Sequence, residues 1–165
     1  MSCRNEKILL SDSGTNNFSS GVSGWKLINY SCIAGHLGLF LIAMYEIYVE
    51  THFSAAHHLR DYCGKCEAPH GHNWIVEAYV QCEKLNEIGI GIDFKDVKDS
   101  VKIILEDLDH KDLNELAIFS KENPSSENIA KYLFKKLSQA LNNDNIRVSK
   151  IKVCETPGNG SLYWE

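Results

Sequence analysis

Two histidines separated by a single residue, His70 and His72, are the clearest chemical feature of the sequence. On a strand, residues at positions i and i+2 point to the same side, and Gly71 leaves room for close approach. Two imidazoles on one face provide half of a zinc site. His57 follows an earlier expected strand, and it faces both histidines if the two strands pair as a hairpin, whereas adjacent His58 should point away. Three histidines would leave one position of Zn²⁺ open, as a catalytic site requires.

A second metal arrangement uses other residues of the same stretch. Cys63 and Cys66 precede His70 and His72 closely enough to form a closed site of two cysteines and two histidines. Such a structural site would leave His57 unused and no position open for chemistry. The residues alone therefore keep a non-catalytic zinc-binding protein as an alternative to an enzyme.

Groups that could transfer protons lie next to the histidines. Cys66 lies four residues before His70, and Lys65 beside it favours the thiolate, which suits a general base held near a metal. Glu67 is a second candidate base. The ordinary alternatives are a small buried thiol and a solvated loop carboxylate.

Three polar residues farther along the chain are also candidates. Asp109 and His110 stand in a polar turn, where an aspartate can fix the tautomer of a histidine and the pair can relay a proton. Glu155 shares one strand face with Ile151 and Val153, so its carboxylate points where apolar residues point. Because a buried carboxylate is costly unless it is paired, a ligand with a guanidine-like N–C–N edge would suit Glu155. A capping aspartate and a solvated strand end remain the alternatives.

The elements that position these residues predict an α+β domain. Two apolar stripes at helical spacing predict helices that begin after Asp93 and after Ser125, each a good N-cap. Alternating apolar residues predict four strands, over residues 45–50, 72–82, about 147–155 and near 162. The order strand, strand, helix, helix, strand, strand corresponds to an antiparallel sheet with two helices on one face.

Composition limits the class of protein. The 165 residues are 44% hydrophobic and 24% charged, which is typical of a globular domain. A net charge of −5 gives no general attraction to nucleic acid or to an anionic membrane. The longest apolar stretch, residues 32–45, is too short to span a bilayer. With no secretory leader at its start, the chain is expected to keep its six cysteines reduced in the cytoplasm.

Residues 1–43 differ from the rest of the chain. Residues 11–24 are rich in serine, asparagine and glycine, which suits a flexible segment. We therefore expect a partly disordered N-terminal extension over 1–43 and a patterned domain over 44–165. Met44, at the start of the patterned region, could itself be a translation start.

Six short motifs occur in a characteristic order between about residues 44 and 164. They are FSAAH at 53–57, CEAPHGHNW at 66–74, IDF at 92–94, LDH at 108–110, NPSSEN at 123–128 and CET at 154–156. Together they resemble the 6-pyruvoyltetrahydropterin synthase and 6-carboxytetrahydropterin synthase family.

The resemblance implies a fold and a set of roles. The fold would be the tunnelling fold, whose subunits join into an oligomeric barrel, here a homohexamer built from two trimers. The zinc ligands would be His57, His70 and His72. The other roles would be a Cys66 base, partnered by Asp109 and His110 from a neighbouring subunit, and pterin binding by Glu155, Ser125 and Ser126.

The resemblance also implies a reaction. The substrate would be 7,8-dihydroneopterin triphosphate, and the short Cys-x3-His-Gly-His spacing is similar to that of enzymes that form 6-carboxytetrahydropterin for queuosine, with release of acetaldehyde and triphosphate. A pyruvoyl-forming branch is the alternative. Another branch forms 6-hydroxymethyl-dihydropterin with a glutamate base, a role that Glu67 could take. Charge alone makes Arg60, Lys65 and Lys111 candidate triphosphate contacts.

Overall fold

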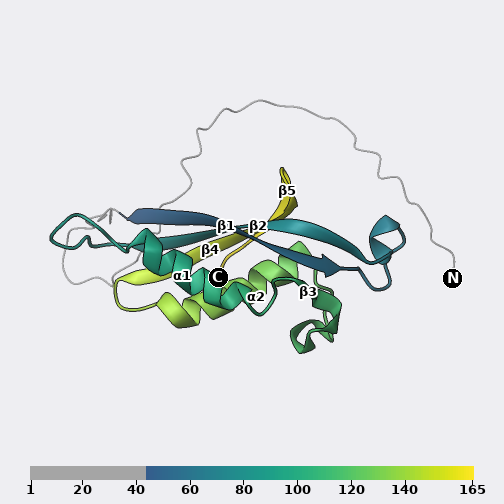
Figure 1. Cartoon of the computed structure of the whole chain (residues 1–165). Coiled ribbons are helices and arrows are strands. Elements are labelled where there is room, and N and C mark those ends of the chain that lie inside the picture. Colours follow the sequence, from purple (N-terminus) through teal and green to yellow (C-terminus); the bar gives the residue numbers. More distant parts are fainter. Residues whose placement is uncertain (1–43) are drawn as a thin grey trace, which may run out of the picture. The chain divides into compact units, whose positions relative to one another are not determined.

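The computed structural model describes residues 44–165, so the extension expected over 1–43 lies outside the described residues. The elements follow the predicted order of two strands, two helices and two strands, with one short additional strand between the helices (Figure 1). Three single 3-10 turns, η1 (Lys65–Glu67), η2 (Leu113–Glu115) and η3 (Ala117–Phe119), lie between them. The main elements are β1 (Tyr45–His57), β2 (His70–Cys82), α1 (Phe94–Leu105), β3 (Lys111–Asp112), α2 (Ser126–Leu141), β4 (Ile146–Thr156) and β5 (Asn159–Tyr163).

The strands form one sheet in the order β3-β1-β2-β4-β5. The pairs β1–β2, β2–β4 and β4–β5 are antiparallel, as predicted. The addition is β3, which pairs in parallel with Ala55 and Ala56 of β1. Two residues are too few for an alternating pattern, so this strand left no signal in the sequence.

Both helices begin at the predicted caps. The Asp93 side chain accepts a hydrogen bond from the Lys95 backbone N–H at 2.8 Å, and Ser125 Oγ accepts one from the Asn128 N–H at 3.4 Å. Each bond satisfies a backbone donor that the first turn of a helix leaves free. The residue before this cap is Pro124, so the start of α2 also fixes the position of the Pro124 backbone carbonyl, which contacts His57.

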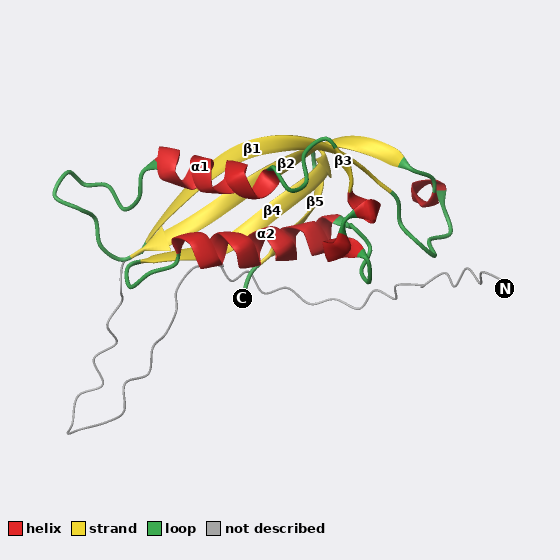
Figure 2. Ribbon diagram, turned by 60° about the horizontal axis from the view of Figure 1, so that its bottom comes forward, coloured by secondary structure: helices red, strands yellow, loops and turns green. Residues whose placement is uncertain are grey.

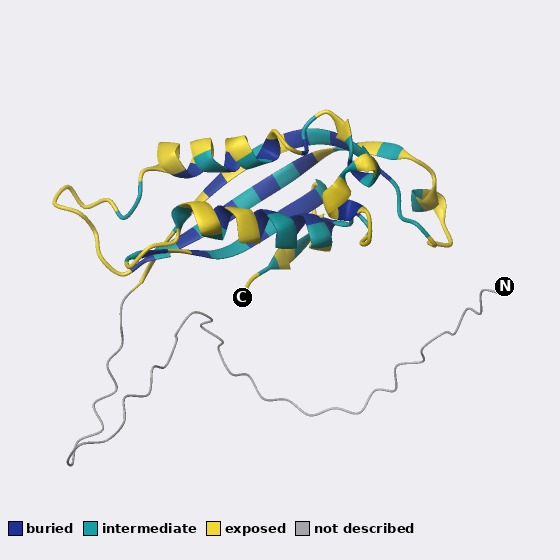
Figure 3. Ribbon diagram, turned by 90° about the horizontal axis from the view of Figure 1, so that it is seen from below, coloured by how far each residue is buried: buried dark blue, intermediate teal, exposed yellow. Residues whose placement is uncertain are grey.

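The two helices cover one face of the sheet (Figure 2). Buried residues lie where the helices meet the strands, and the outward faces of the helices are exposed (Figure 3). Trp74, Val76, Ala78 and Val80 of β2 are fully buried, as the alternation of that strand predicts. Within residues 44–165, neither helix combines the length and the apolar character that a membrane crossing requires.

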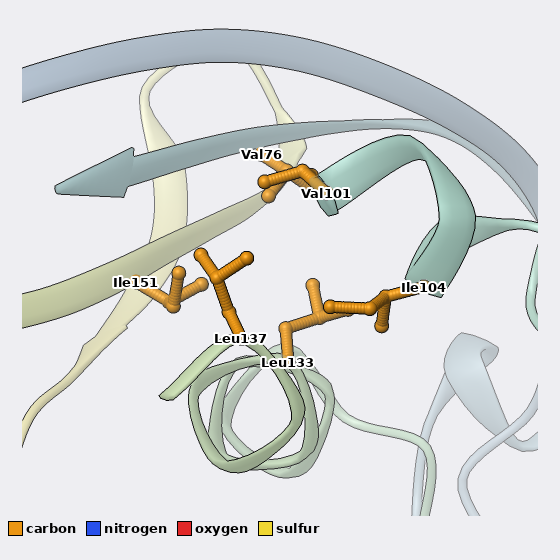
Figure 4. Close-up of a pocket in the computed structure, with 6 residues that line it drawn as sticks. All are labelled: Val76, Val101, Ile104, Leu133, Leu137 and Ile151. Carbon is orange, nitrogen blue, oxygen red and sulfur yellow. The ribbon is translucent and has the colours of Figure 1, made fainter. Parts of the chain in front are cut away.

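A small gap between the helices and the sheet allows a test of the core. Six aliphatic side chains surround about 10 Å³ of space (Figure 4), from Val76, Val101, Ile104, Leu133, Leu137 and Ile151. We expect Leu137→Ala to enlarge this gap and to lower the free energy of unfolding by about 2–5 kcal/mol. Urea denaturation measures the loss. Ile103→Ala, on the exposed face of α1, is the control and should change stability by less than about 0.5 kcal/mol.

Candidate metal centre and active site

The hairpin of β1 and β2 brings the three predicted histidines together. His57 lies directly opposite His70 in the register, and His72 lies opposite Ala55. Directly paired residues share a face of the sheet, so the three imidazoles project to one side. The prediction placed His57 after the first strand. It is in fact the last residue of β1, because pairing with β2 continues to that position.

The three imidazoles form a compact cluster. Their ring centroids are 4.6 Å apart for His57 and His70, 5.2 Å for His57 and His72, and 4.8 Å for His70 and His72. One ligand nitrogen from each ring lies within 4.8 Å of the other two. Nitrogens that share a zinc ion each lie about 2.0–2.1 Å from it, so small ring rotations would bring all three into bonding distance.

Hydrogen bonds fix which nitrogen of two rings carries the proton. Nδ1 of His57 lies 2.8 Å from the carbonyl oxygen of Pro124, and Nδ1 of His70 lies 2.8 Å from that of Ala68. A carbonyl only accepts, so each Nδ1 is the donor and each Nε2 keeps a free lone pair. Metal-binding histidines are usually oriented by such a bond to a carbonyl or carboxylate.

Two of the remaining ring nitrogens have no hydrogen-bond partner in the protein. Nε2 of His57 and Nε2 of His72 are buried and have no hydrogen-bond partner. Unsatisfied buried polar atoms are rare because each one costs free energy. A cation among the three histidines would satisfy both atoms, and these residues therefore make a possible metal site.

Burial also favours the neutral form of two of these histidines. Trp74 is fully buried next to the cluster, with its ring centroid 4.8 Å from that of His57 and 5.3 Å from that of His72. Burial lowers the pKa of both His57 and His72, against the opposing effect of the Glu155 carboxylate. A histidine binds metal through its neutral form, so a lowered pKa favours metal binding at neutral pH.

Glu155 lies at this centre. Its side chain shares a face of β4 with buried Ile151 and Val153, as predicted. Its Oε1 lies 4.0 Å from Nε2 of His57, and the side chain is 32% exposed. The carboxylate therefore borders the space that the unpartnered nitrogens face.

The start of α2 forms a second wall beside the cluster. The Pro124 carbonyl that holds His57 directly precedes Ser125 and Ser126 in the chain. Ser126 is buried, and its Oγ lies 2.7 Å from Oγ of Ser161 in β5. Glu127 was not among the predicted site residues. Its own backbone N–H and the Ser125 hydroxyl lower the pKa of its carboxyl, and the run of serines before an acidic residue was the available signal.

The loop between the hairpin strands carries both candidate bases. Cys66 and Glu67 lie in the turn η1, and the Cys66 carbonyl accepts a hydrogen bond from the Leu59 N–H at 2.8 Å. Cys66 is half-buried and Glu67 is exposed. Within residues 44–165 the metal-ligand cluster includes His57 and neither Cys63 nor Cys66, so the closed cysteine–histidine site is not assembled.

Asp109 and His110 form a pair beside Ser54 of β1. Oδ1 of Asp109 accepts a hydrogen bond from the Ser54 N–H at 2.8 Å, and Oδ2 lies 3.0 Å from Nδ1 of His110. The His110 N–H donates to the Ser54 carbonyl at 2.6 Å, and the His110 side chain is 80% exposed. His110 lines a shallow pocket with Ser54, Asn73 and His72, the last of which belongs to the histidine cluster. Asp109 and His110 are not members of the compact group of possible metal ligands among the described residues.

Two of the three candidate triphosphate contacts have other partners. Nη2 of Arg60 donates to the carbonyls of Phe119, at 2.6 Å, and Glu122, at 2.5 Å. Nζ of Lys111 donates to the carbonyls of Glu106 and Asp107, both at 3.0 Å, beyond the end of α1. These two cations therefore stabilise helix ends and turns. Lys65 is the remaining candidate for a triphosphate contact.

The described domain matches a known protein family over almost its whole length. A family described as 6-pyruvoyl tetrahydropterin synthase matches residues 46–165. The chain belongs to this family. The family resemblance predicted from the six motifs, and with it the assignment to a lyase family, is thereby confirmed.

Named relatives come from both branches of the family. A 6-carboxy-5,6,7,8-tetrahydropterin synthase of Synechocystis is 37% identical over 102 residues, which cover 59% of this chain and 78% of the relative. One from Rickettsia conorii is 30% identical over 123 residues, covering 64% of this chain and 89% of the relative. The solved 6-pyruvoyl tetrahydropterin synthase of Caenorhabditis elegans aligns with a TM-score of 0.67 at 27% identity, over 76% of this chain and 99% of that structure.

The fold is confirmed independently of close sequence similarity. The 6-pyruvoyl tetrahydropterin synthase of Plasmodium falciparum aligns with a TM-score of 0.60 at 23% identity, over 74% of this chain and 98% of that structure. This likeness establishes the predicted tunnelling fold of the described domain, with its sheet and two covering helices.

Proposed function

We propose that the protein binds one Zn²⁺ through His57, His70 and His72 and converts 7,8-dihydroneopterin triphosphate to 6-carboxy-5,6,7,8-tetrahydropterin, with release of acetaldehyde and triphosphate. The observation that carries the proposal is the pair of buried, unpartnered Nε2 atoms on His57 and His72. It is supported by the names of the Synechocystis and Rickettsia relatives. The free thiols of Cys66, Cys82 and Cys154 agree with a protein of the cytoplasm.

Each residue of the site has a role that its position supports. The bound metal would act as a Lewis acid that makes protons of the substrate side chain more acidic. Cys66, in the loop that joins the two ligand-bearing strands, would take a proton from the side-chain carbon as thiolate. Glu155 would hold the N–C–N edge of the pterin through two hydrogen bonds, beside the polar wall of Ser125 and Ser126.

The proposed oligomer follows from the position of Asp109 and His110. The pair is held by the Ser54 N–H, and the His110 side chain is 80% exposed. We infer that it completes the active site of a neighbouring subunit, where His110 would exchange protons with the reacting group. A homohexamer of two trimers would provide such sites and would cover the open edges of the sheet at β1 and β5.

The second candidate is the branch that forms 6-hydroxymethyl-dihydropterin. It is favoured by Glu67, because this carboxylate lies in the same turn as Cys66 and could serve as the base. The pyruvoyl-forming reaction is the third outcome, named for the Caenorhabditis relative. All three use the same centre and differ in the bond that breaks.

Product analysis separates these outcomes. The zinc-loaded protein is incubated with 7,8-dihydroneopterin triphosphate, and the pterin formed is identified by mass spectrometry. We expect the carboxy product, with acetaldehyde released in equal amount. A pyruvoyl or hydroxymethyl product would move the protein to another branch, and no turnover by a folded, zinc-loaded oligomer would contradict the enzymatic proposal.

A further inference from the structure

The Glu155 carboxylate occupies the open side of the histidine cluster. Its Oε1 lies 4.0 Å from Nε2 of His57, the same atom that is buried without a hydrogen-bond partner. The carboxylate therefore lies beside the position where a metal bound to that nitrogen would be found. A residue that only anchored the pterin would contact the end of the substrate far from the metal. The proximity of Glu155 to Nε2 of His57 is therefore more than that role requires.

The backbone of β4 explains how the side chain reaches this position. The pairing of β4 with β2 ends at Cys154 opposite Ile75, one residue before Glu155. On the other side, the register with β5 shifts between Cys154 and Thr156, so Glu155 is the extra residue of an irregular step. Such bulges leave the extra residue unpaired, so Glu155 stands outside the regular hydrogen-bonded pairing of β4.

Charge compensation at Glu155 is weak among the described residues. Among the described residues the ion-pair partner of its carboxylate is His57 alone, at the outer limit of an ionic contact. A partly buried carboxylate is costly without a cation, and a divalent metal held by the three histidines would supply one.

From this geometry we propose that Glu155 is an exchangeable fourth ligand: it binds the metal while the active site is empty, and the substrate displaces it. The inference rests on the proposed metal centre and adds a second state to it. Zinc accepts carboxylate oxygen as readily as imidazole nitrogen, and four ligands complete its usual coordination. On displacement the carboxylate becomes free to bind the pterin edge, so one residue would serve both the empty and the occupied site.

The proposal predicts a change in metal affinity without substrate. Glu155→Gln keeps the size of the side chain and removes its charge, and we expect it to raise the dissociation constant for zinc by about 10–100-fold. The constant is measured in the oligomeric protein by competition with a chromogenic chelator. Glu83→Gln removes the same charge at an exposed position after β2 and should leave zinc affinity unchanged.

A spectroscopic measurement tests the exchange itself. The wild-type protein is loaded with Co²⁺, whose visible absorption reports its ligands, and is then titrated with 7,8-dihydroneopterin triphosphate. We expect wild type and Glu155→Gln to differ in spectrum before addition and to converge at saturation. Equal zinc affinity together with identical spectra before addition would overturn the exchange and leave the metal centre intact. Failure of the wild-type protein to bind either metal would instead overturn the proposed function.

Discussion

Replacing His57 with alanine is expected to remove zinc from the protein. His57 is 1% exposed, lies opposite His70 and is the ligand whose orientation the Pro124 carbonyl fixes. Its loss removes the most buried of the three histidine ligands and leaves at most two histidines with the Glu155 carboxylate, so we expect zinc affinity to fall by more than about 100-fold, since loss of an outer-shell partner alone costs 10–100-fold. Metal content after dialysis, measured by atomic absorption, checks the result.

The choice of control makes this experiment decisive. His52 belongs to the same strand and is exposed, and His52→Ala should retain one zinc per chain. Retention of zinc by His57→Ala would restore the alternative site of Cys63, Cys66, His70 and His72. Loss of zinc with retained secondary structure, measured by circular dichroism, would establish the three-histidine site.

The clustering of the three histidines could be predicted because it depends on local periodicity and one hairpin. His70 and His72 share a face in any strand, and a hairpin places the end of the first strand beside the start of the second. The end of β1 was harder to locate, because Ala55 and Ala56 are weak strand formers. Those residues are extended because β2 pairs with them on one side and β3 on the other.

Other parts of the site depend on contacts that no local pattern contains. The Pro124 carbonyl reaches His57 across 67 residues, and Ser54 meets Asp109 across 55. Arg60 and Lys111 were candidates for triphosphate because charge alone does not show whether a cation faces solvent. In the folded chain both donate to backbone carbonyls near the ends of helices and turns, an outcome decided by tertiary packing.

Cys66→Ala is expected to retain zinc and to lose most activity. Cys66 lies outside the cluster of metal-binding histidines, so removing its thiol should leave metal content and fold unchanged. Loss of a general base typically costs about 10²–10⁴-fold in rate, and we expect kcat to fall within this range with little change in KM. Steady-state kinetics on the zinc-loaded oligomer measure both constants.

The neighbouring residues determine how this result is interpreted. Cys63→Ala removes a thiol three residues away in the same loop and is expected to keep kcat within about 3-fold of wild type, far less than the loss of a general base. Glu67→Gln removes the competing base. If Glu67→Gln abolished turnover while Cys66→Ala kept it, the base would be the carboxylate, and the hydroxymethyl branch would replace the carboxy branch. The identity of the base therefore bears on the branch, because the carboxy reaction is proposed with the Cys66 thiolate and the hydroxymethyl reaction with the Glu67 carboxylate, both in the turn η1.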